Sequence, residues 1–274
     1  MSESGAKRTG GLSDADLFGA YMRLTGTPSL EPEEGESAAL RGKRLGIVNG
    51  SSWVTLWATY FGRKMLPGVK LINVGNDAVQ LNFMRAHHEG RPCPPERNIE
   101  LFVDYAEQLV ELFGVDAILI TCSTMNRSAE QVREAMTRHG VPVVQIDEPM
   151  MDAAVKRGGK ILVVATHGPT VASTQALLQE TADSTGKSVS FAGVTVEEAF
   201  HLLGAGDVAG HNEVVSAAIR EAVSREPVET VVLAQLSMSV FAFAYPDSER
   251  TFGAPVLTSG EEGFKRVRAI LEAH

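Results

Sequence analysis

The 274-residue sequence predicts an α/β protein made of two similar halves. From Lys43 onward, short apolar runs typical of buried parallel strands alternate with amphipathic helical segments, which is the pattern of the α/β class. Asp116 and Glu229, which open two of these runs, are 113 positions apart. Pro142 and Pro255, in the next run of each half, have the same separation. We therefore expect two homologous α/β domains, each with a parallel sheet flanked by helices.

Eight strands are expected, because each of eight runs is rich in Val, Ile and Leu and is bounded by turn residues. Their ranges are 44–49, 69–74, 116–121, 141–146, 160–165, 188–194, 229–234 and 254–258. The strongest helix spans 98–113, with one apolar face and Gly114 as its stop. Further helices are expected over 128–138, from the fourth strand to about 157, from about 170, through 214–223, and from 259. Ser128 with Gln131, and Ser259 with Glu262, have the spacing of capping boxes.

The chain divides into an extension and two domains. Residues 1–40 form an N-terminal extension rich in Gly, Ser, Pro and Glu, which either packs on the body or a partner or stays partly ordered. Ser13 could cap a short amphipathic helix there that carries Leu17, Phe18, Tyr21 and Met22. The first domain is expected at 43–157, joined by the C-terminal segment 255–274, and the second at 158–254.

Composition excludes several classes of protein. Lys and Arg number 25 against 34 Asp and Glu, so the formal net charge is −9, which disfavours nucleic-acid binding. No apolar run reaches the roughly 18 residues of a membrane helix, and the N-terminus lacks a secretory signal. Two cysteines do not make a disulfide framework. We expect a cytoplasmic protein with neither a nucleic-acid nor a membrane partner.

Small polar residues follow four of the expected strands. Ligands of parallel α/β sheets bind at the carboxyl ends of the strands, where helix N-termini offer free N–H groups to an anion. Such loops suit a small carboxylate or phosphate, although strand-end loops are polar in most proteins. The side chains expected to bind the substrate are Asn49, Ser51, Ser123, Thr124, Thr170, Gln235 and Ser237.

Two residues are candidates for acid/base catalysis. Cys122 ends an apolar strand beside an expected helix start, which can lower the pKa of a thiol; the alternative is a buried, inert cysteine. His167 lies in the loop that opens the second half and titrates near neutral pH; the alternative is an exposed loop histidine. Cys93 lies in a turn-rich loop and is given no role. The other histidines lack the company of further ligands, so no metal is expected.

One motif carries a resemblance to a known family. Residues 118–124 (ILITCST) match a strand-Cys-(Asn/Ser)-Thr motif, and residues 45–50, 206–211 and 255–257 are also similar. Over about residues 43–272 the sequence resembles the aspartate/glutamate/hydantoin racemase superfamily. The resemblance implies two α/β domains with the active site in the cleft between them. It also implies cofactor-independent proton transfer, with one cysteine from each half facing the α-carbon of the substrate.

The second half departs from the family pattern. Where the family has strand-Gly-Cys-Thr-Glu, residues 233–237 are LAQLS, and the 113-residue offset places Gln235 opposite Cys122. Glutamine has no proton to exchange near neutral pH, and Ser237 or Ser239 is a poor base without an activating partner. The resemblance therefore implies that Cys122 is the only cysteine acid/base.

Four functions remain open after these observations. A racemase or isomerase of a small carboxylate comes first, because this is the majority activity of the family. A single-cysteine decarboxylase, a Cys-nucleophile hydrolase or transferase, and a non-catalytic metabolite-binding protein are the alternatives. The expected partners are a small carboxylate substrate and, as an option, further copies of the chain in a homo-oligomer.

Overall fold

The computed structural model describes residues 15–16, 19–20 and 37–273, with the backbone alone at 168–169. Most of the helix predicted around Leu17 and Tyr21 therefore lies outside the described residues.

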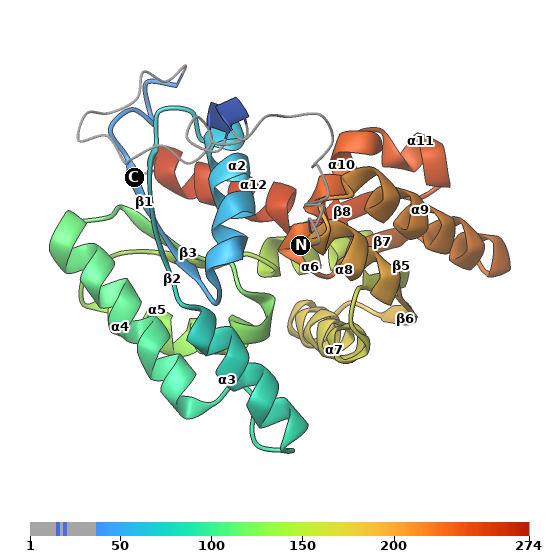
Figure 1. Cartoon of the computed structure of the whole chain (residues 1–274), viewed down its shortest axis with the longest axis horizontal. Coiled ribbons are helices and arrows are strands. Elements are labelled where there is room, and N and C mark those ends of the chain that lie inside the picture. The colour runs from blue at the N-terminus through green and yellow to red at the C-terminus, as the bar shows by residue number, and fades with distance from the viewer. Residues whose placement is uncertain (1–14, 17–18, 21–36, 274) are drawn as a thin grey trace, which may run out of the picture.

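Two four-stranded parallel sheets form the centre of the molecule (Figure 1). The first sheet has the order β2-β1-β3-β4, made of β1 (Arg44–Asn49), β2 (Lys70–Gly75), β3 (Ala117–Ile120) and β4 (Val143–Gln145). The second has the order β6-β5-β7-β8, made of β5 (Gly159–Ala165), β6 (Val189–Thr195), β7 (Thr230–Leu233) and β8 (Val256–Thr258). The shared strand order confirms the predicted α/β class with two similar halves, and every predicted strand is present with its ends shifted by two residues at most.

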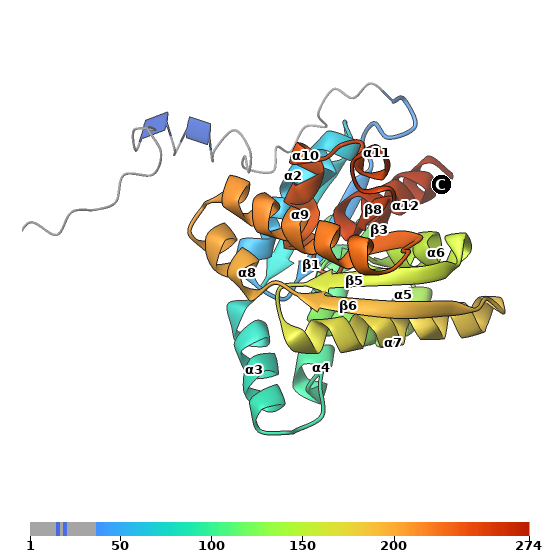
Figure 2. The same cartoon turned by 90° about the vertical axis from the view of Figure 1, so that its right-hand side faces the viewer.

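Helices cover both faces of each sheet. Figure 2 shows β5 and β6 between α9 (Val208–Arg225) on one side and α7 (Gly168–Thr185) on the other. In β3, Ala117 and Leu119 pack into one core cluster and Ile118 and Ile120 into another, all fully buried. Burial on both faces explains why these strands are continuous apolar runs rather than alternating ones.

The remaining helices connect successive strands, except the last one, which follows β8. They are η1 (Ser52–Val54), α2 (Thr55–Met65), α3 (Asp77–His88), α4 (Glu96–Phe113), η2 (Ser123–Ser128), α5 (Ala129–Thr137), α6 (Glu148–Arg157), α8 (Glu197–Gly204), η3 (Leu236–Val240), α10 (Phe241–Ala244), α11 (Ser248–Phe252) and α12 (Ser259–Ala273). The predicted end of α4 is confirmed, because Gly114 adopts the left-handed conformation with φ 61°.

Both predicted capping boxes are wrong. The hydroxyl of Ser128 donates to the carbonyl of Met125 at 2.6 Å, because η2 runs directly into α5 and leaves Ser128 in a helical conformation. Ser259 is already the first residue of α12. The hydroxyl oxygen of Thr258 instead accepts from the N–H of Glu261 at 3.3 Å.

The last helix of each half packs on the sheet of the other half. Phe264 and Val267 of α12 join a core cluster with Leu45 of β1, and Figure 1 shows α12, in red, beside α2. Conversely, Met150 of α6 joins a cluster with Val163 of β5. The segment 255–274 is thus divided, since β8 pairs with β7 in the second sheet while α12 packs on the first half.

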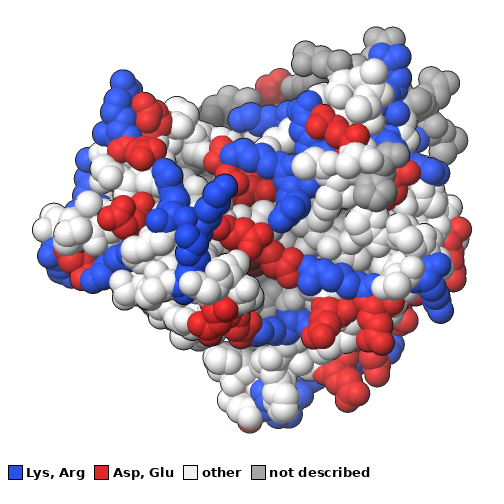
Figure 3. Space-filling view, turned by 180° about the vertical axis from the view of Figure 1, so that it is seen from behind, with Lys and Arg blue, Asp and Glu red and all other residues white. Residues whose placement is uncertain are grey.

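Charged side chains of both signs intermingle on the face opposite that of Figure 1, as Figure 3 shows. Within the described part of the chain, no helix combines the length and the apolar character needed to cross a membrane.

Candidate active site

The loops that follow β1, β3 and β4 lie side by side at the carboxyl end of the first sheet. β3 lies between β1 and β4 in this sheet. The N–H of Thr121, just after β3, donates to the carbonyl of Val48 in β1 at 3.1 Å. The N–H of Ile146, just after β4, donates to the carbonyl of Ile120 in β3 at 3.0 Å. The two halves of the molecule also meet at this end. The Trp53 ring of η1 lies 6.3 Å from the Phe200 ring of α8.

Cys122 follows β3 and is the residue before η2, with 7% of its surface exposed. Its Sγ lies 3.1 Å from the hydroxyl oxygen of Thr124, which is 3.4 Å from Oε1 of Gln80 on α3. Burial raises the pKa of the Cys122 thiol, and hydrogen bonds from the Thr124 hydroxyl and from the N–H groups of Met125 and Thr124 oppose this rise. The expected net lowering of this pKa is wrong, because burial outweighs the donors at the helix start.

Gly50 makes room for the thiol. A Cβ placed on Gly50 would lie 2.3 Å from Sγ of Cys122, well inside van der Waals contact. Any side chain at this position would displace the cysteine. The glycine turn after β1 is therefore part of the site, although it contributes no polar atom.

Asn49 has no exposed surface, and its amide is occupied within the protein. Its Nδ2 group donates to Thr55 and to Asn73, both at 3.3 Å, and its Oδ1 accepts from the hydroxyl of Thr121. Asn49 thus ties the ends of β1, β2 and β3 together beneath the site. Ser51 is also buried, and its hydroxyl makes no capping hydrogen bond to η1.

Gln235 holds the position in the second half that Cys122 holds in the first. It follows β7 and precedes η3, as Cys122 follows β3 and precedes η2. Its Oε1 accepts from the backbone N–H of Thr166 at 2.8 Å and from the Thr166 hydroxyl at 2.9 Å. Thr166 is the first residue after β5, so the second half places a threonine where the first has Gly50. The side-chain carbonyl of Gln235 is therefore bonded to Thr166 within the protein, and the Nε2 group of Gln235 can donate to a ligand.

His167 is the residue just before α7, and it packs on an aromatic side chain. Its ring lies 4.7 Å from the ring of Phe200, and no described contact joins it to Cys122. Burial lowers the pKa of His167, while the nearby Glu197 carboxylate raises it in part, so the imidazole is neutral near pH 7. Thr170 in α7 and Ser237 in η3 are both partly exposed.

An ion pair also joins the two halves. Arg127 of η2 makes two hydrogen bonds of 2.7 Å to the two carboxylate oxygens of Glu180 on α7. This bidentate geometry is stronger and more directional than that of a single bond. Arg127 lies five residues after Cys122, so the pair fixes the cysteine loop against the second half.

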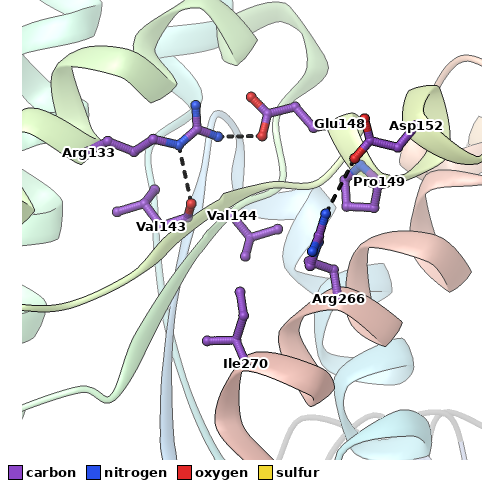
Figure 4. Close-up of a pocket in the computed structure, with 8 residues that line it drawn as sticks. All are labelled: Arg133, Val143, Val144, Glu148, Pro149, Asp152, Arg266 and Ile270. Atoms are coloured by element: carbon purple, nitrogen blue, oxygen red, sulfur yellow. Dashed lines mark hydrogen bonds and ion pairs between the residues drawn. The ribbon is translucent and has the colours of Figure 1, made fainter. Parts of the chain in front are cut away.

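A separate cavity of about 310 Å³ lies beside β4, α5, α6 and α12 (Figure 4). Arg133 there pairs with Glu148 and donates to the carbonyl of Val143, and Arg266 pairs with Asp152 at 3.4 Å. None of the residues predicted for the site lines this cavity. Within the described ranges, no group of three or more His, Cys, Asp or Glu side chains is placed to hold a metal ion.

The sequence profile of the Asp/Glu/Hydantoin racemase family matches residues 93–267, which is more than half of the chain. The chain belongs to this racemase family. Cys122, His167 and Gln235 lie inside the matched range, and Asn49 and Ser51 lie before it.

Solved structures of racemases share the fold. An aspartate racemase homologue from Pyrococcus horikoshii OT3 has a TM-score of 0.62 at 19% identity and covers 84% of this chain and 99% of its own. Glutamate racemase isoform RacE1 from Bacillus anthracis has a TM-score of 0.58 at 19% identity and covers 85% of this chain and 83% of its own. Allantoin racemase from Klebsiella pneumoniae has a TM-score of 0.57 at 18% identity and covers 85% of this chain and 89% of its own. A comparison with curated proteins finds no match.

Sequence reasoning missed Gly50, Gln80 and Thr166 as parts of this racemase-family site. Gln80 reaches Thr124 from α3, a helix that was not predicted. An alignment of the ends of β1 and β5 could have found Gly50 and Thr166. Gly50 faces Cys122, which follows β3, and Thr166 faces Gln235, which follows β7.

Proposed function

We propose that this member of the racemase family is a cofactor-independent isomerase that transfers a proton at the carbon next to the carboxylate or carbonyl of a small acid. Cys122 is the acid/base group of the proposal. The observation that carries it is the placement of this thiol at the carboxyl end of β3, in the space left by Gly50 and within 3.1 Å of the Thr124 hydroxyl. The names of its structural relatives, which are aspartate, glutamate and allantoin racemases, support the substrate class.

The Thr124 hydroxyl suits both protonation states of the thiol. It can accept from the S–H group while donating to Gln80, and it can turn to donate to the thiolate. The thiolate removes the proton from the α-carbon of the substrate. The carbanion that forms needs oriented hydrogen-bond donors, and Ser51, Ser123 and the Nε2 group of Gln235 supply them in this proposal. Asn49 holds the loop, and Thr170 and Ser237 extend the substrate-binding surface.

The return of the proton on the opposite face needs a second acid/base. Gln235 cannot serve, so His167 takes this role in the proposal: its imidazolium form donates the proton, and its neutral form, which the lowered pKa of His167 favours, accepts a proton when the reaction runs in the opposite direction.

Decarboxylation is the second candidate, and Gln235 is the observation that favours it. Thr166 holds the Gln235 carboxamide in place with two hydrogen bonds, and a carboxamide carries no exchangeable acid/base proton at neutral pH. In this reaction the C–C bond of a dicarboxylic acid breaks, carbon dioxide leaves, and the electron pair stays on the α-carbon. The Cys122 thiol then donates its proton to that carbon, so one cysteine is sufficient.

Incubation of the protein in D2O with amino acids, hydantoins and malonic acids separates these functions. Loss of the α-proton signal in NMR together with optical inversion supports the isomerase. Exchange of the α-proton without optical inversion contradicts a two-base racemase and agrees with an enzyme that uses one base. Release of carbon dioxide selects the decarboxylase, and thermal stabilisation by an acid without any turnover contradicts both enzymes.

A further inference from the structure

Asp147 is a buried carboxyl group beside Cys122 that the proposed function does not use. It is the residue after Ile146, just beyond the end of β4, and only 2% of its surface is exposed. Because β3 and β4 pair in parallel with Ile120 opposite Gln145, the residues that follow the two strands are neighbours. Asp147 therefore lies next to the cysteine loop.

The hydrogen bonds of Asp147 are incomplete. Its Oδ2 accepts from Nε2 of Gln145 at 2.9 Å, and the Oε1 atom of that glutamine accepts from the N–H groups of Asp147 and Glu148 at 2.8 and 2.9 Å. Its Oδ1 has no well-formed partner among the described residues. Nearby hydroxyls of Ser123 and Ser259 favour the charged form.

No cation balances this carboxylate within the described residues. The charged or titratable groups that face it are Glu148 on its own helix and Cys122 on the cysteine loop, while α12 presents the neutral Ser259. Arg133 is engaged with Glu148. A buried carboxylate without a counterion is costly, and burial raises the pKa of Asp147 to about 6.

Asp147 and Cys122 also act on each other. Burial is the largest cause that raises the pKa of the Cys122 thiol, and the negative charge of Asp147 adds to this rise. Two acidic groups that share a buried site resist ionising together, because the second negative charge is repelled by the first.

We propose that Asp147 is a positioning residue that biases the protonation state of Cys122, so that the thiolate forms less readily once the Asp147 carboxyl has lost its proton. Ionised Asp147 adds to the effect of burial and disfavours the thiolate, and neutral Asp147 removes this added effect. The inference deepens the proposed function, because it names what controls the acid/base cysteine. It concerns the thiol itself, so it can be tested without any substrate.

The test measures the alkylation rate of Cys122 by iodoacetamide between about pH 5 and pH 8, a reaction that follows the thiolate population. The exposed Cys93 is replaced by Ser throughout, so that a single thiol reacts. Asp147→Asn keeps the shape of the side chain without its charge. Asp152→Asn is the matched control, because it changes an exposed aspartate on the same helix.

Below about pH 6 the Asp147→Asn variant and the parent should react at similar rates, because the side chain at position 147 is uncharged in both. Above this pH the plot of the logarithm of the parent rate against pH should flatten. The variant should then react faster than the parent, by about tenfold for each unit by which ionised Asp147 raises the pKa of Cys122. Asp152→Asn should follow the parent.

A parent profile that keeps unit slope over the whole range would overturn the proposal, even if Asp147→Asn fails to fold. Superimposed profiles of the parent and the folded Asp147→Asn variant would overturn it as well. Neither result depends on catalysis. A chain that turns over no acid but shows the flattened profile contradicts the proposed function and leaves the coupling intact.

Discussion

Cys122 and Gln235 occupy equivalent positions in the two halves of the molecule. Each follows the third strand of its sheet and precedes a 3-10 helix, and its carbonyl accepts from the N–H of the methionine three residues later, Met125 or Met238, at 3.0 Å in both cases. The offset of 113 residues seen in the sequence thus holds in three dimensions. One half presents a thiol at this point and the other a carboxamide, and this asymmetry is the basis of the predictions below.

Replacing Gln235 by Cys should raise the ratio of optical inversion to α-proton exchange, because it adds a second thiol at the position equivalent to Cys122. Gln235→Ser is the control, since it shortens the side chain in the same way without an acidic thiol. Polarimetry and NMR in D2O on the same samples give the two rates. An unchanged ratio in the Cys variant would show that position 235 does not face the α-carbon.

Gly50→Ala should destabilise the fold by about 1–3 kcal/mol, because the new methyl group overlaps Sγ of Cys122. Urea unfolding measures the loss. Gly204→Ala is the control, since the position is exposed at the end of α8 and a Cβ there meets nothing within 4 Å. This control should be neutral or gain up to about 1 kcal/mol. Equal effects at both glycines would contradict the close packing of Gly50 on the thiol.

Thr124→Val should raise the pKa of the Cys122 thiol, because it removes a hydroxyl that donates to the thiolate. The loss of a hydrogen bond worth about 1 kcal/mol corresponds to roughly fivefold slower alkylation at a given pH. Thr137→Val, which removes a hydroxyl bonded to the Arg133 carbonyl on exposed α5, should leave the rate unchanged. An unchanged rate in Thr124→Val would exclude the hydroxyl from control of the thiol.

Asp147→Asn should become progressively more stable than the parent as the pH rises. The folded state holds the Asp147 proton up to about pH 6, whereas the unfolded chain releases it near 3.8, so the parent loses stability between these values. From about pH 4 to about pH 7 the advantage of the variant should grow by about 2 kcal/mol. Urea unfolding at both pH values tests this, with Asp152→Asn expected to show no such trend. A constant difference would mean that the carboxyl is not held neutral by the fold.

The sequence predicted the strands well because both faces of each sheet are covered. Runs such as 161–165 are apolar at every position, and their short length, their β-branched residues and the glycines that precede them favour a strand over a helix. Helices α2 and α3 were missed. Half of the residues from Asp77 to His88 are polar, and the helix buries only Val79 and Ala86, so it lacks a wide buried apolar face.

The site was only partly predictable. Cys122 carried a motif, and Gln235 followed from the duplication. Asp147 looks in the sequence like the cap of a helix, and its burial arises from the packing of α12, which starts more than one hundred residues later. The C-terminal segment was expected to join the first domain, but the packing of α6 on the second sheet was not expected, because an apolar helix face does not specify which sheet it covers.

The most direct test of the proposed chemistry compares Cys122→Ser with Cys93→Ser in the exchange of α-protons for deuterium. Serine keeps the size of Cys122 but cannot ionise in the working range, and Cys93 is exposed and outside the site. Cys122→Ser should exchange α-protons at least about 10²-fold more slowly than the parent, while Cys93→Ser should exchange them at the rate of the parent. Full exchange activity in a folded Cys122→Ser variant would contradict the assignment of Cys122 as the acid/base group.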